Sequence, residues 1–455
     1  MGRPNIVFYF SDQQRWDTLG CYGQKLPVTP NLDRLAKEGV RFENAFTCQP
    51  VCGPARACLQ TGKYATQTGC YINGIAPAFG EIKTLAQCFN EAGYATAYIG
   101  KWHLATDRQK GLNYETSAIP QERRGGYKDY WMASDVLEFT SHGYNGYVYN
   151  ADNERVPFTG YRADCINNFA IDFLHTRKGN EEPFFLFVSQ IEPHHQNDHR
   201  CYEGPDGSKE KFADYEAPGD LKAYSDAHND GSDISNWKQS YPDYLGCCHN
   251  LDANVGRLVD TLKEQGMWEN TILVYTADHG SHFITRGLEA EYKRTCHDAS
   301  IHIPMIITGP GFKGGKEIQH AVSLLDLPAT LLDCAGIAKP DDFQGRSLLP
   351  LVQNPDMEWD DVAFLQISES RVGRAIRTPE YTYSVRAVGD GYAVAESDVY
   401  YEEFFYVLKD DPYQQHNLAN DPAWASKRAE LAEVLKKKMV QAGEAAPEIL
   451  PWKQW

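Results

Sequence analysis

The sequence predicts an α/β fold in which helices flank a mostly parallel β-sheet, followed by a smaller α+β domain at the C-terminus. Short apolar runs suited to buried strands alternate with segments whose apolar residues recur at helical spacing. This alternation ends near Pro350, and shorter strand-like runs with one final helix follow it. We therefore expect a main domain over residues 1–355 and a second domain over residues 356–455.

Five strands of the main domain are predicted from short apolar runs. The first run, Ile6–Phe10, contains only aliphatic and aromatic residues and suits a strand that is buried on both faces. The others are Ala95–Ile99, Phe184–Val188, Thr271–Thr276 and Met305–Ile307. Because helical segments alternate with these runs, we expect most of the strands to run parallel.

Helices are predicted where capping residues precede an amphipathic pattern. Thr29 is a good N-cap and Pro30 suits the first position of a helix, which Gly39 then ends. The same pattern recurs over Thr84–Gly93. A longer helix is predicted over residues 244–265, where Leu and Val recur at helical spacing.

Two long polar segments, residues 105–159 and 196–241, interrupt this pattern. Loops of that length inside a compact fold are usually functional, so we expect both to shape a binding pocket. The first segment carries Arg123, Arg124 and Lys128 among Tyr and Trp residues. That mixture suits the ring of a sugar or a steroid, although a solvated surface is the simpler explanation for the charges.

The C-terminal domain is predicted to contain a small antiparallel sheet and a terminal helix. The helix begins at Asp421 and Pro422 and ends near Ala442. The predicted strands are Val362–Ile367, Ala375–Arg377, Tyr381–Val385 and Glu403–Leu408.

Composition excludes several classes of protein. The 455 residues contain 44 Lys and Arg against 62 Asp and Glu, a net charge of −18, so nucleic acid is not expected as a partner. No apolar run approaches the about 20 residues that span a membrane. An anionic substrate would need local cations or a metal ion to hold it, because the overall field repels anions.

The first strand begins near Asn5 and leaves no room for a signal peptide. We therefore expect a cytoplasmic protein with mostly reduced thiols, or a periplasmic or secreted one if a leader has been removed. The 12 cysteines show no recurrent zinc-binding spacing.

Polar residues that could carry chemistry follow four of the predicted strands. Ligands bind at the carboxyl ends of strands in an open parallel sheet, so these residues are expected to meet at one edge. Any one of them alone could belong to an ordinary turn, but four such coincidences are hard to explain by chance. The residues are Asp12, Gln13, Lys101, His103, His194, Asp278 and His279.

The most specific motif runs from Cys52 to Gly62, with Pro54 and Arg56 inside it. It resembles the sulfatase signature C-x-P-x-R with its Leu-x-Thr-Gly tail. The resemblance extends in the right order over nearly the whole chain, and it implies a formylglycine-dependent type I sulfatase with an alkaline-phosphatase-like fold. The other matching segments are Asn5–Gly23, Gly100–His103, Asn270–Gly280, Ile303–Gly311, Gln344–Leu348, Tyr406–Pro412 and Asn417–Leu418.

In sulfatases the signature cysteine is oxidised to formylglycine (3-oxoalanine), and the hydrate of this aldehyde attacks the sulfur of the ester. The resemblance therefore implies that Cys52 is converted by a formylglycine-generating enzyme or a radical maturation enzyme. It also implies a metal site whose mostly oxygen ligands suit Ca²⁺, with Mg²⁺ or Mn²⁺ as alternatives. The implied ligands are Asp12, Gln13, Asp278, His279 and the group derived from Cys52.

The resemblance also implies catalytic roles. Arg56 would hold the formylglycine oxygens and the metal region, and Lys101 and Lys293 would bind the sulfate oxygens. His103 would contact the hydrate and act as the base for sulfate release. His194 would be the general acid for the leaving group. Its neighbour His195 is the weaker candidate for that role.

The metal ligands differ from the commonest family pattern. The first loop of the family commonly reads Asp-Asp, whereas this chain has Asp12-Gln13. A neutral Gln, together with a neutral His279, lowers the negative charge around the ion and leaves the identity of the metal open. The pattern also resembles phosphonate and phosphodiester hydrolases of the same superfamily.

The predicted function is hydrolysis of a sulfate monoester of a saccharide or of another small molecule, such as an aryl or steroid sulfate. The alternative enzyme is a phosphonate monoester or phosphodiester hydrolase. An alternative of another class is a non-catalytic binder of sulfated glycans, in which Cys52 would remain a thiol.

Overall fold

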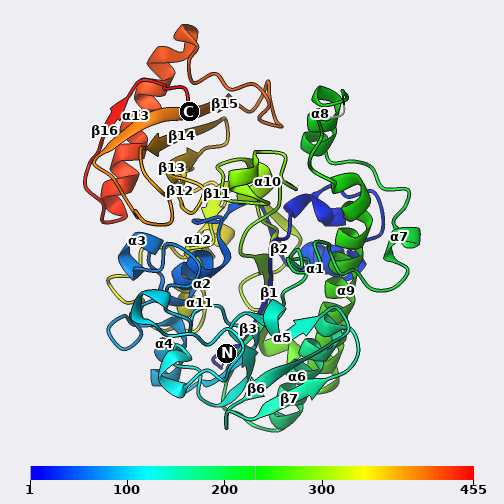
Figure 1. Cartoon of the computed structure of the whole chain (residues 1–455). Coiled ribbons are helices and arrows are strands. Elements are labelled where there is room, and N and C mark those ends of the chain that lie inside the picture. The colour runs from blue at the N-terminus through cyan, green and yellow to red at the C-terminus, as the bar shows by residue number, and fades with distance from the viewer. Residues whose placement is uncertain (1, 231) are drawn as a thin grey trace.

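A computed structural model describes residues 2–230 and 232–455 of the chain, and it contains a large and a small β-sheet (Figure 1). The large sheet has the strand order β11-β2-β10-β9-β1-β8-β3-β4-β6-β5, and β7 pairs with β6. Its strands are β1 (Asn5–Ser11), β2 (Val40–Phe46), β3 (Ala95–Lys101), β4 (Tyr130–Ser134), β5 (Ser141–His142), β6 (Asn145–Asn150), β7 (Arg155–Phe158), β8 (Phe184–Ser189), β9 (Thr271–Ala277), β10 (Met305–Thr308) and β11 (Lys316–Ser323).

The centre of the large sheet is parallel, as predicted. Strands β9, β1, β8, β3 and β4 are parallel neighbours. Strand β10 is an exception, because it runs antiparallel to both β9 and β2. The strands at one edge of the sheet, from β4 to β7, also pair in antiparallel fashion. The α/β class is therefore confirmed, and the sheet is mixed. Its parallel core contains the four strands that precede the candidate site residues.

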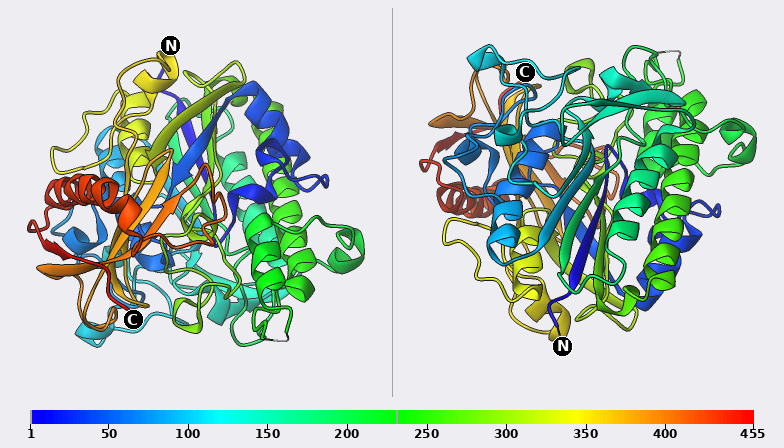
Figure 2. Two further views of the ribbon diagram at one scale, coloured as in Figure 1. Left: turned by 90° about the horizontal axis from the view of Figure 1, so that it is seen from above. Right: turned by 90° about the horizontal axis from the view of Figure 1, so that it is seen from below.

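Helices cover both faces of the large sheet, which Figure 2 shows in two views. One face packs against α1 (Pro30–Glu38), α6 (Arg162–Thr176) and α9 (Trp237–Glu264). The other face packs against helices that share a second apolar cluster with Phe8 and Phe10 of β1. These are α2 (Cys52–Thr61), α4 (Leu85–Glu91), α11 (Asp326–Cys334) and α12 (Leu349–Gln353). Because each helix layer covers one face of the sheet, both faces of the central strands are apolar, and their sequences are continuous hydrophobic runs.

The predicted helix ends agree with the local chemistry. Helix α1 begins at Pro30 and ends before Gly39. Helix α4 begins after Thr84, whose hydroxyl accepts a hydrogen bond from the backbone N–H of Gln87, while the Gln87 side chain accepts one from the Thr84 N–H. This reciprocal pair is a capping box. Helix α9 begins at Trp237, earlier than the predicted residue 244, and contains Pro242 near its start.

The two long polar segments are more regular than predicted. The first contains β4, α5 (Leu137–Thr140) and β5 to β7, and the second contains α7 (Ser208–Lys211) and α8 (Gly219–Ala227). Trp131 and Tyr127 lie in the core around Trp102. Arg124 is buried too, and its guanidinium donates to backbone carbonyls and to Asn153. This mixture therefore does not line the described cavity. Its aromatic rings cover the sheet, and Lys128 is exposed to solvent, as the simpler explanation expected.

The smaller sheet has the order β12-β13-β14-β15-β16 and lies beside the large one in Figure 1. All its pairs are antiparallel except β15 with β16. Helix α13 (Ala425–Gln441) packs on it through Leu431, Leu435 and Met439. A boundary near residue 355 remains a prediction. The strands are β12 (Ala363–Ile367), β13 (Val372–Arg377), β14 (Tyr381–Ala387), β15 (Val399–Val407) and β16 (Glu448–Leu450).

Two further sequence predictions concern the chain as a whole. Each of the 12 cysteines lies in the described part of the chain as a free thiol. Among the described residues, none of the helices is both long and apolar enough to cross a membrane.

A buried ion pair joins the small sheet to the main domain. The Arg377 guanidinium donates to both carboxylate oxygens of Asp298, at 2.9 and 2.8 Å, from the end of β13 to the start of α10 (Asp298–Ile301). We expect Arg377→Ala to lower the free energy of unfolding by about 3–5 kcal/mol, because it leaves a buried carboxylate without its charged partner. Urea unfolding followed by circular dichroism measures this change.

The matched control is Arg34→Ala on the exposed face of α1, which should change the free energy of unfolding by no more than about 0.5 kcal/mol. Equal unfolding midpoints for the two variants would show that the Arg377–Asp298 pair contributes nothing to the attachment of the small sheet.

Candidate active site

The candidate residues from four strands meet at one edge of the large sheet. The pairing of β1 with β9 sets Ser11 opposite Ala277, so that Asp12 and Asp278 follow at the same level. Lys101 ends β3, and His194 follows β8 after a short turn. A cavity of about 160 Å³ opens above these strand ends. Its lining includes Gln13, Cys52, Lys101, His103, His194 and Lys293.

Cys52 lies at the start of α2, at the bottom of the cavity, and only 1% of it is exposed. Lys293 donates a hydrogen bond to its sulfur at 2.9 Å, and Nε2 of His279 lies 3.2 Å from it. The thiol faces an oxygen of Asp12 at 3.4 Å. Cys52 therefore lies at a helix N-terminus with an ammonium group beside it.

Arg56 comes from the same helix, one turn after Cys52, and binds the carboxylates behind the cavity. Its guanidinium donates to Asp12 at 2.9 Å and to Asp278 at 3.4 Å, and also to the hydroxyl of Ser189. The guanidinium lies 5.2 Å from the centre of the Phe10 ring. Among the described contacts of Arg56 there is none with Cys52, so the structure places this residue as a support for the two carboxylates.

The two carboxylates have opposite pKa shifts. Burial raises the pKa of Asp12, but the charges of Lys101, His194 and Arg56 lower it well below its usual value. Lys101 donates to Asp12 at 2.7 Å. For Asp278, burial raises the pKa, and so does the negative charge of Asp12. A buried carboxylate that repels its neighbour is a natural ligand for a cation.

His279 and Gln13 complete this cluster. Burial lowers the pKa of His279 to about 4, so its imidazole is neutral. Its Nδ1 lies 2.9 Å from the carbonyl oxygen of Gly280, which leaves Nε2 facing Cys52. The Gln13 amide donates to Tyr202 and Ser281. Gln13 also has a φ of 66°, a strained conformation that is commonest at functional sites.

These residues fit a divalent cation. The ligand atoms of Asp12, Cys52, Asp278 and His279 all lie within 4.8 Å of one another, and all four residues are buried. Two carboxylates and a neutral imidazole are suitable ligands, whereas a thiol suits a hard ion such as Ca²⁺ poorly. The site therefore fits such an ion better once the sulfur of Cys52 is replaced by oxygen.

Lys101 and His103 both line the cavity. Gly100 precedes them with a φ of 102°, and a Cβ there would collide with the carbonyl oxygen of Ser189 on β8. Only glycine allows β3 to approach β8 so closely just before the site. His103 itself has a φ of 59°. Burial and the charge of Lys101 hold its pKa well below its usual value.

His194 is paired with a carboxylate that the sequence analysis missed. Its Nδ1 lies 3.1 Å from a carboxylate oxygen of Glu138, and its Nε2 lies 3.5 Å from Nζ of Lys293. Burial and Lys101 lower the pKa of His194, but Glu138 and Asp12 outweigh them, so the pKa is raised. The imidazole is therefore set up to carry a proton.

His195 points elsewhere. Its Nε2 accepts a hydrogen bond from the hydroxyl of Tyr292 at 3.0 Å, and its Nδ1 lies 3.2 Å from Asn197. It is not among the residues that line the described cavity. Burial lowers its pKa. Of these two histidines, His194 is the one that lines the described cavity.

Lys293 reaches the cavity from a loop after β9. Burial alone would lower its pKa, but the acidic groups that face it, Cys52 and Asp12 among them, raise it instead. Lys101 and Lys293 are therefore two buried cations on the same small cavity.

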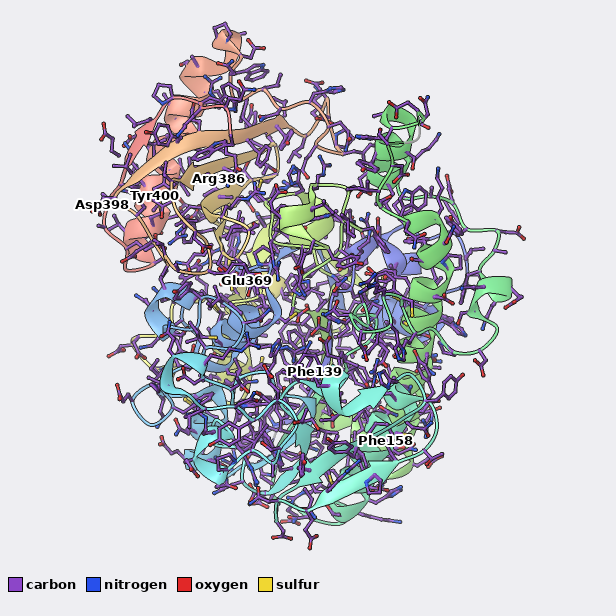
Figure 3. The ribbon with its side chains drawn as sticks, viewed as in Figure 1. Phe139, Phe158, Glu369, Arg386, Asp398 and Tyr400 are labelled. Carbon is purple, nitrogen blue, oxygen red and sulfur yellow. The ribbon has the colours of Figure 1, made fainter. Side chains whose placement is uncertain are left out.

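Other residues around the mouth of the cavity were also missed. One of them is Phe139, which is labelled in Figure 3. Its side chain is 52% exposed. Glu138 and Phe139 both belong to α5, inside the first long segment, so the length of that segment was the only available signal. The remaining members are Asn73, Gly74, Thr106, Arg108, Glu115, Val136, Asn197, Glu291, Tyr292 and Arg294.

The comparisons with known proteins cover the whole site. A family model described as Sulfatase matches residues 4–337, and a model described as N-sulphoglucosamine sulphohydrolase, C-terminal, matches residues 290–442. A ulvan-active sulfatase of Formosa agariphila is 33% identical in a match that covers 97% of this chain and 82% of that protein. An N-acetylglucosamine-6-O-sulfatase of Bacteroides thetaiotaomicron is 28% identical over 98% of this chain and 88% of that protein.

Solved structures share the fold. A candidate sulfatase of Bacteroides fragilis has a TM-score of 0.82 at 27% identity, covering 97% of this chain and 96% of that one. A protein in complex with its substrate D-glucosamine-2-N,6-O-disulfate has a TM-score of 0.74 at 25% identity, covering 97% and 98%. The phosphonate monoester hydrolase of Agrobacterium radiobacter is 21% identical, with a TM-score of 0.71 over 97% and 96%, a likeness of fold alone.

The contact between Glu138 and His194 can be tested by titration. We expect Glu138→Gln to lower the pKa of His194, because the carboxylate charge is one of the two groups that raise it. NMR titration of the histidine side chains measures the shift, and His194→Ala identifies the resonance. Glu115→Gln, which changes another acidic residue of the same cavity, should leave the pKa of His194 unchanged. An equal effect of both substitutions would contradict a specific pair.

Proposed function

The chain belongs to the sulfatase family, and we propose that it hydrolyses the sulfate ester of a sulfated sugar residue. As a family member it is a sulfuric ester hydrolase with an alkaline-phosphatase-like fold. The observation that carries the proposal is the cavity of about 160 Å³ above Cys52, with two buried lysines and two histidines on its walls. Its chemistry suits an anionic group attached to a small polar ring.

The choice of a saccharide rests on the mouth of the cavity and on the relatives. Asn73, Glu115 and Arg294 offer hydrogen-bonding groups for hydroxyls, and Phe139 offers an apolar surface. The cavity is smaller than the about 300–1,000 Å³ of typical small-molecule sites, so it suits one sugar ring. Sugar sulfatases are among the relatives, and one neighbour was solved with a disulfated glucosamine.

We propose that Cys52 is converted to formylglycine by a maturation enzyme and that Asp12, Gln13, Asp278 and His279 hold a calcium ion beside it. Mg²⁺ or Mn²⁺ are the alternatives. When present, these groups would supply the nucleophilic oxygen and a positive charge that lowers its pKa. The buried pair of repelling carboxylates and the poor match of a thiol to a hard ion support both parts of the proposal.

The other residues of the cavity bind the sulfate and transfer protons. Lys101 and Lys293 neutralise the sulfate oxygens as buried point charges. His194, with its raised pKa, gives a proton from Nε2 to the departing alcohol oxygen, while Glu138 holds Nδ1. His103 stays neutral because its pKa is low. Its Nδ1 is buried without a hydrogen-bond partner among the described residues, so it can accept a proton during turnover.

The direct test is the release of sulfate by protein that has been matured beside a formylglycine-generating enzyme. We expect faster hydrolysis of sulfated monosaccharides than of a phenyl phosphonate, and we expect peptide mass analysis to show Cys52 without its thiol. Cys52→Ala should release no sulfate, because it cannot be converted. Rates on each substrate, measured with the same preparation, give the comparison.

The alternatives predict different outcomes in this experiment. A clear preference for the phosphonate would favour the phosphonate or phosphodiester hydrolase. An unconverted Cys52 in natively matured protein, together with binding of sulfated glycans but no turnover, would favour the non-catalytic binder.

The two histidines can be separated by the leaving group. We expect His194→Ala to lose about 10²–10⁴-fold in rate on a sulfated sugar and much less on nitrophenyl sulfate, because nitrophenolate departs without a proton. His103→Ala should lower both rates alike. Steady-state kinetics on the two substrates measure these losses. His195→Ala is the matched control, and it should show no such dependence on the leaving group.

Equal losses on both substrates for His194→Ala would show that this residue binds the substrate or supports the site. The proton donor would then be another residue. That result would leave the proposed reaction untouched, because hydrolysis of the sugar sulfate by the unsubstituted enzyme is measured independently.

A further inference from the structure

We propose that His142, Asp198 and His199 form a second metal site, one that takes a divalent transition-metal ion such as Zn²⁺. The three residues offer one ligand atom each, and these atoms all lie within 4.8 Å of one another. This cluster is separate from the residues around Cys52 and has a different ligand chemistry. The proposal does not depend on the substrate of the enzyme.

The three side chains lie close together on the surface. The rings of His142 and His199 stack with their centroids 4.1 Å apart and their planes 8° from parallel. Nε2 of His142 lies 2.8 Å from a carboxylate oxygen of Asp198. About half of each side chain is exposed, so an ion can enter from solvent and keep water as its remaining ligand. A surface hollow of about 400 Å³, lined in part by His142, lies beside the cluster.

A fourth residue, Glu203, holds one of the imidazoles in the orientation that a metal ligand needs. Nδ1 of His199 lies 2.6 Å from a carboxylate oxygen of Glu203. The carboxylate therefore accepts a hydrogen bond from Nδ1–H, and the lone pair of Nε2 is left for an ion. Histidine ligands of metals usually have such a carboxylate or carbonyl behind them, which fixes the tautomer and the ring orientation.

The ligand set selects the type of ion. Two imidazoles and one carboxylate suit Zn²⁺ and its transition-metal neighbours, whereas Ca²⁺ takes six to eight oxygen ligands. The site near Asp12 and Asp278 has the opposite preference, because its carboxylates are the main ligands. Excess Ca²⁺ should therefore leave the second site free for Zn²⁺.

An ion at this position would join the two segments that carry Glu138 and His194. His142 follows α5, which contains Glu138, and Asp198 lies four residues after His194. Gln196 already links these segments, because its amide donates to the carbonyl oxygen of Glu138 and to Asp198. A metal ion would add a second, stronger link and restrain the loop that carries His194.

Metal titration in excess Ca²⁺ tests the proposal. We expect the full chain to bind one more equivalent of Zn²⁺, measured by calorimetry, than either His142→Ala or His199→Ala. With Co²⁺ as the probe, visible absorption should show a band that both variants lack. Glu203→Gln should keep the site but weaken its affinity about 10–100-fold, because it loses the charged partner of His199.

His416→Ala is the matched control, since it removes another exposed histidine far along the chain from the cluster. It should bind Zn²⁺ like the unsubstituted protein. Thermal unfolding without transition metal should be the same for His142→Ala, His199→Ala and His416→Ala, because these three side chains are exposed. Any binding of Zn²⁺ at the Cys52 site occurs equally in every variant and cancels in the difference.

The predicted restraint has its own measurement. Zn²⁺ should slow amide hydrogen exchange over residues 194–203 in the unsubstituted protein and in His416→Ala, but not in His142→Ala. Equal stoichiometry and affinity in the unsubstituted protein, His142→Ala and His199→Ala would overturn the site. A site that binds Zn²⁺ without any change in exchange would overturn the restraint of the loop.

Discussion

Two carboxylates buried at the ends of neighbouring strands are the constraint on which the rest of the site depends. The pairing of β1 with β9 brings Asp12 and Asp278 together, and burial makes their mutual repulsion costly. Cations surround them because an uncompensated buried charge is strongly destabilising. Arg56 lies behind both carboxylates and Lys101 lies beside Asp12. These same cations then help to place positive charge under the cavity, in a chain whose net charge is −18.

The cavity is formed by the strand ends of the parallel sheet and by segments outside these strands. The strands fix the residues at its bottom, where positions tolerate little movement. The walls come from distant segments. Glu138 of α5 pairs with His194, and Glu369 of the C-terminal region binds both Arg294 and the backbone N–H of Asn73. Figure 3 labels Glu369 at the lower end of the small sheet, next to the main domain. The small sheet therefore supports two lining residues without lining the cavity itself.

The two proposed metal sites differ in ligand type, so each would prefer a different ion. The buried site has carboxylates held by cations, and it fits a hard ion. The exposed site has two imidazoles, one of them held by Glu203. Lys293 links the buried site to His194, and Asp198 of the second proposed site lies on the loop that follows His194. The proton donor of the proposed reaction would thus be held from two sides by charge.

The sequence by itself determined the α/β class, the four strands that precede Asp12, Lys101, His194 and Asp278, and the meeting of these residues at one edge of the sheet. Cys52, Arg56 and Lys293 joined this set only through the resemblance to sulfatases. The sequence could determine the strands and their common edge because apolar runs report burial locally, and because parallel strands bring their carboxyl ends to one edge whatever the loops do. It could not find Glu138, since a carboxylate in a long polar segment has no local signal of its partner. Nor could it show that Tyr127 and Trp131 cover the core, or that β10 runs antiparallel. Those features depend on contacts between residues far apart in the chain, which only the tertiary structure decided.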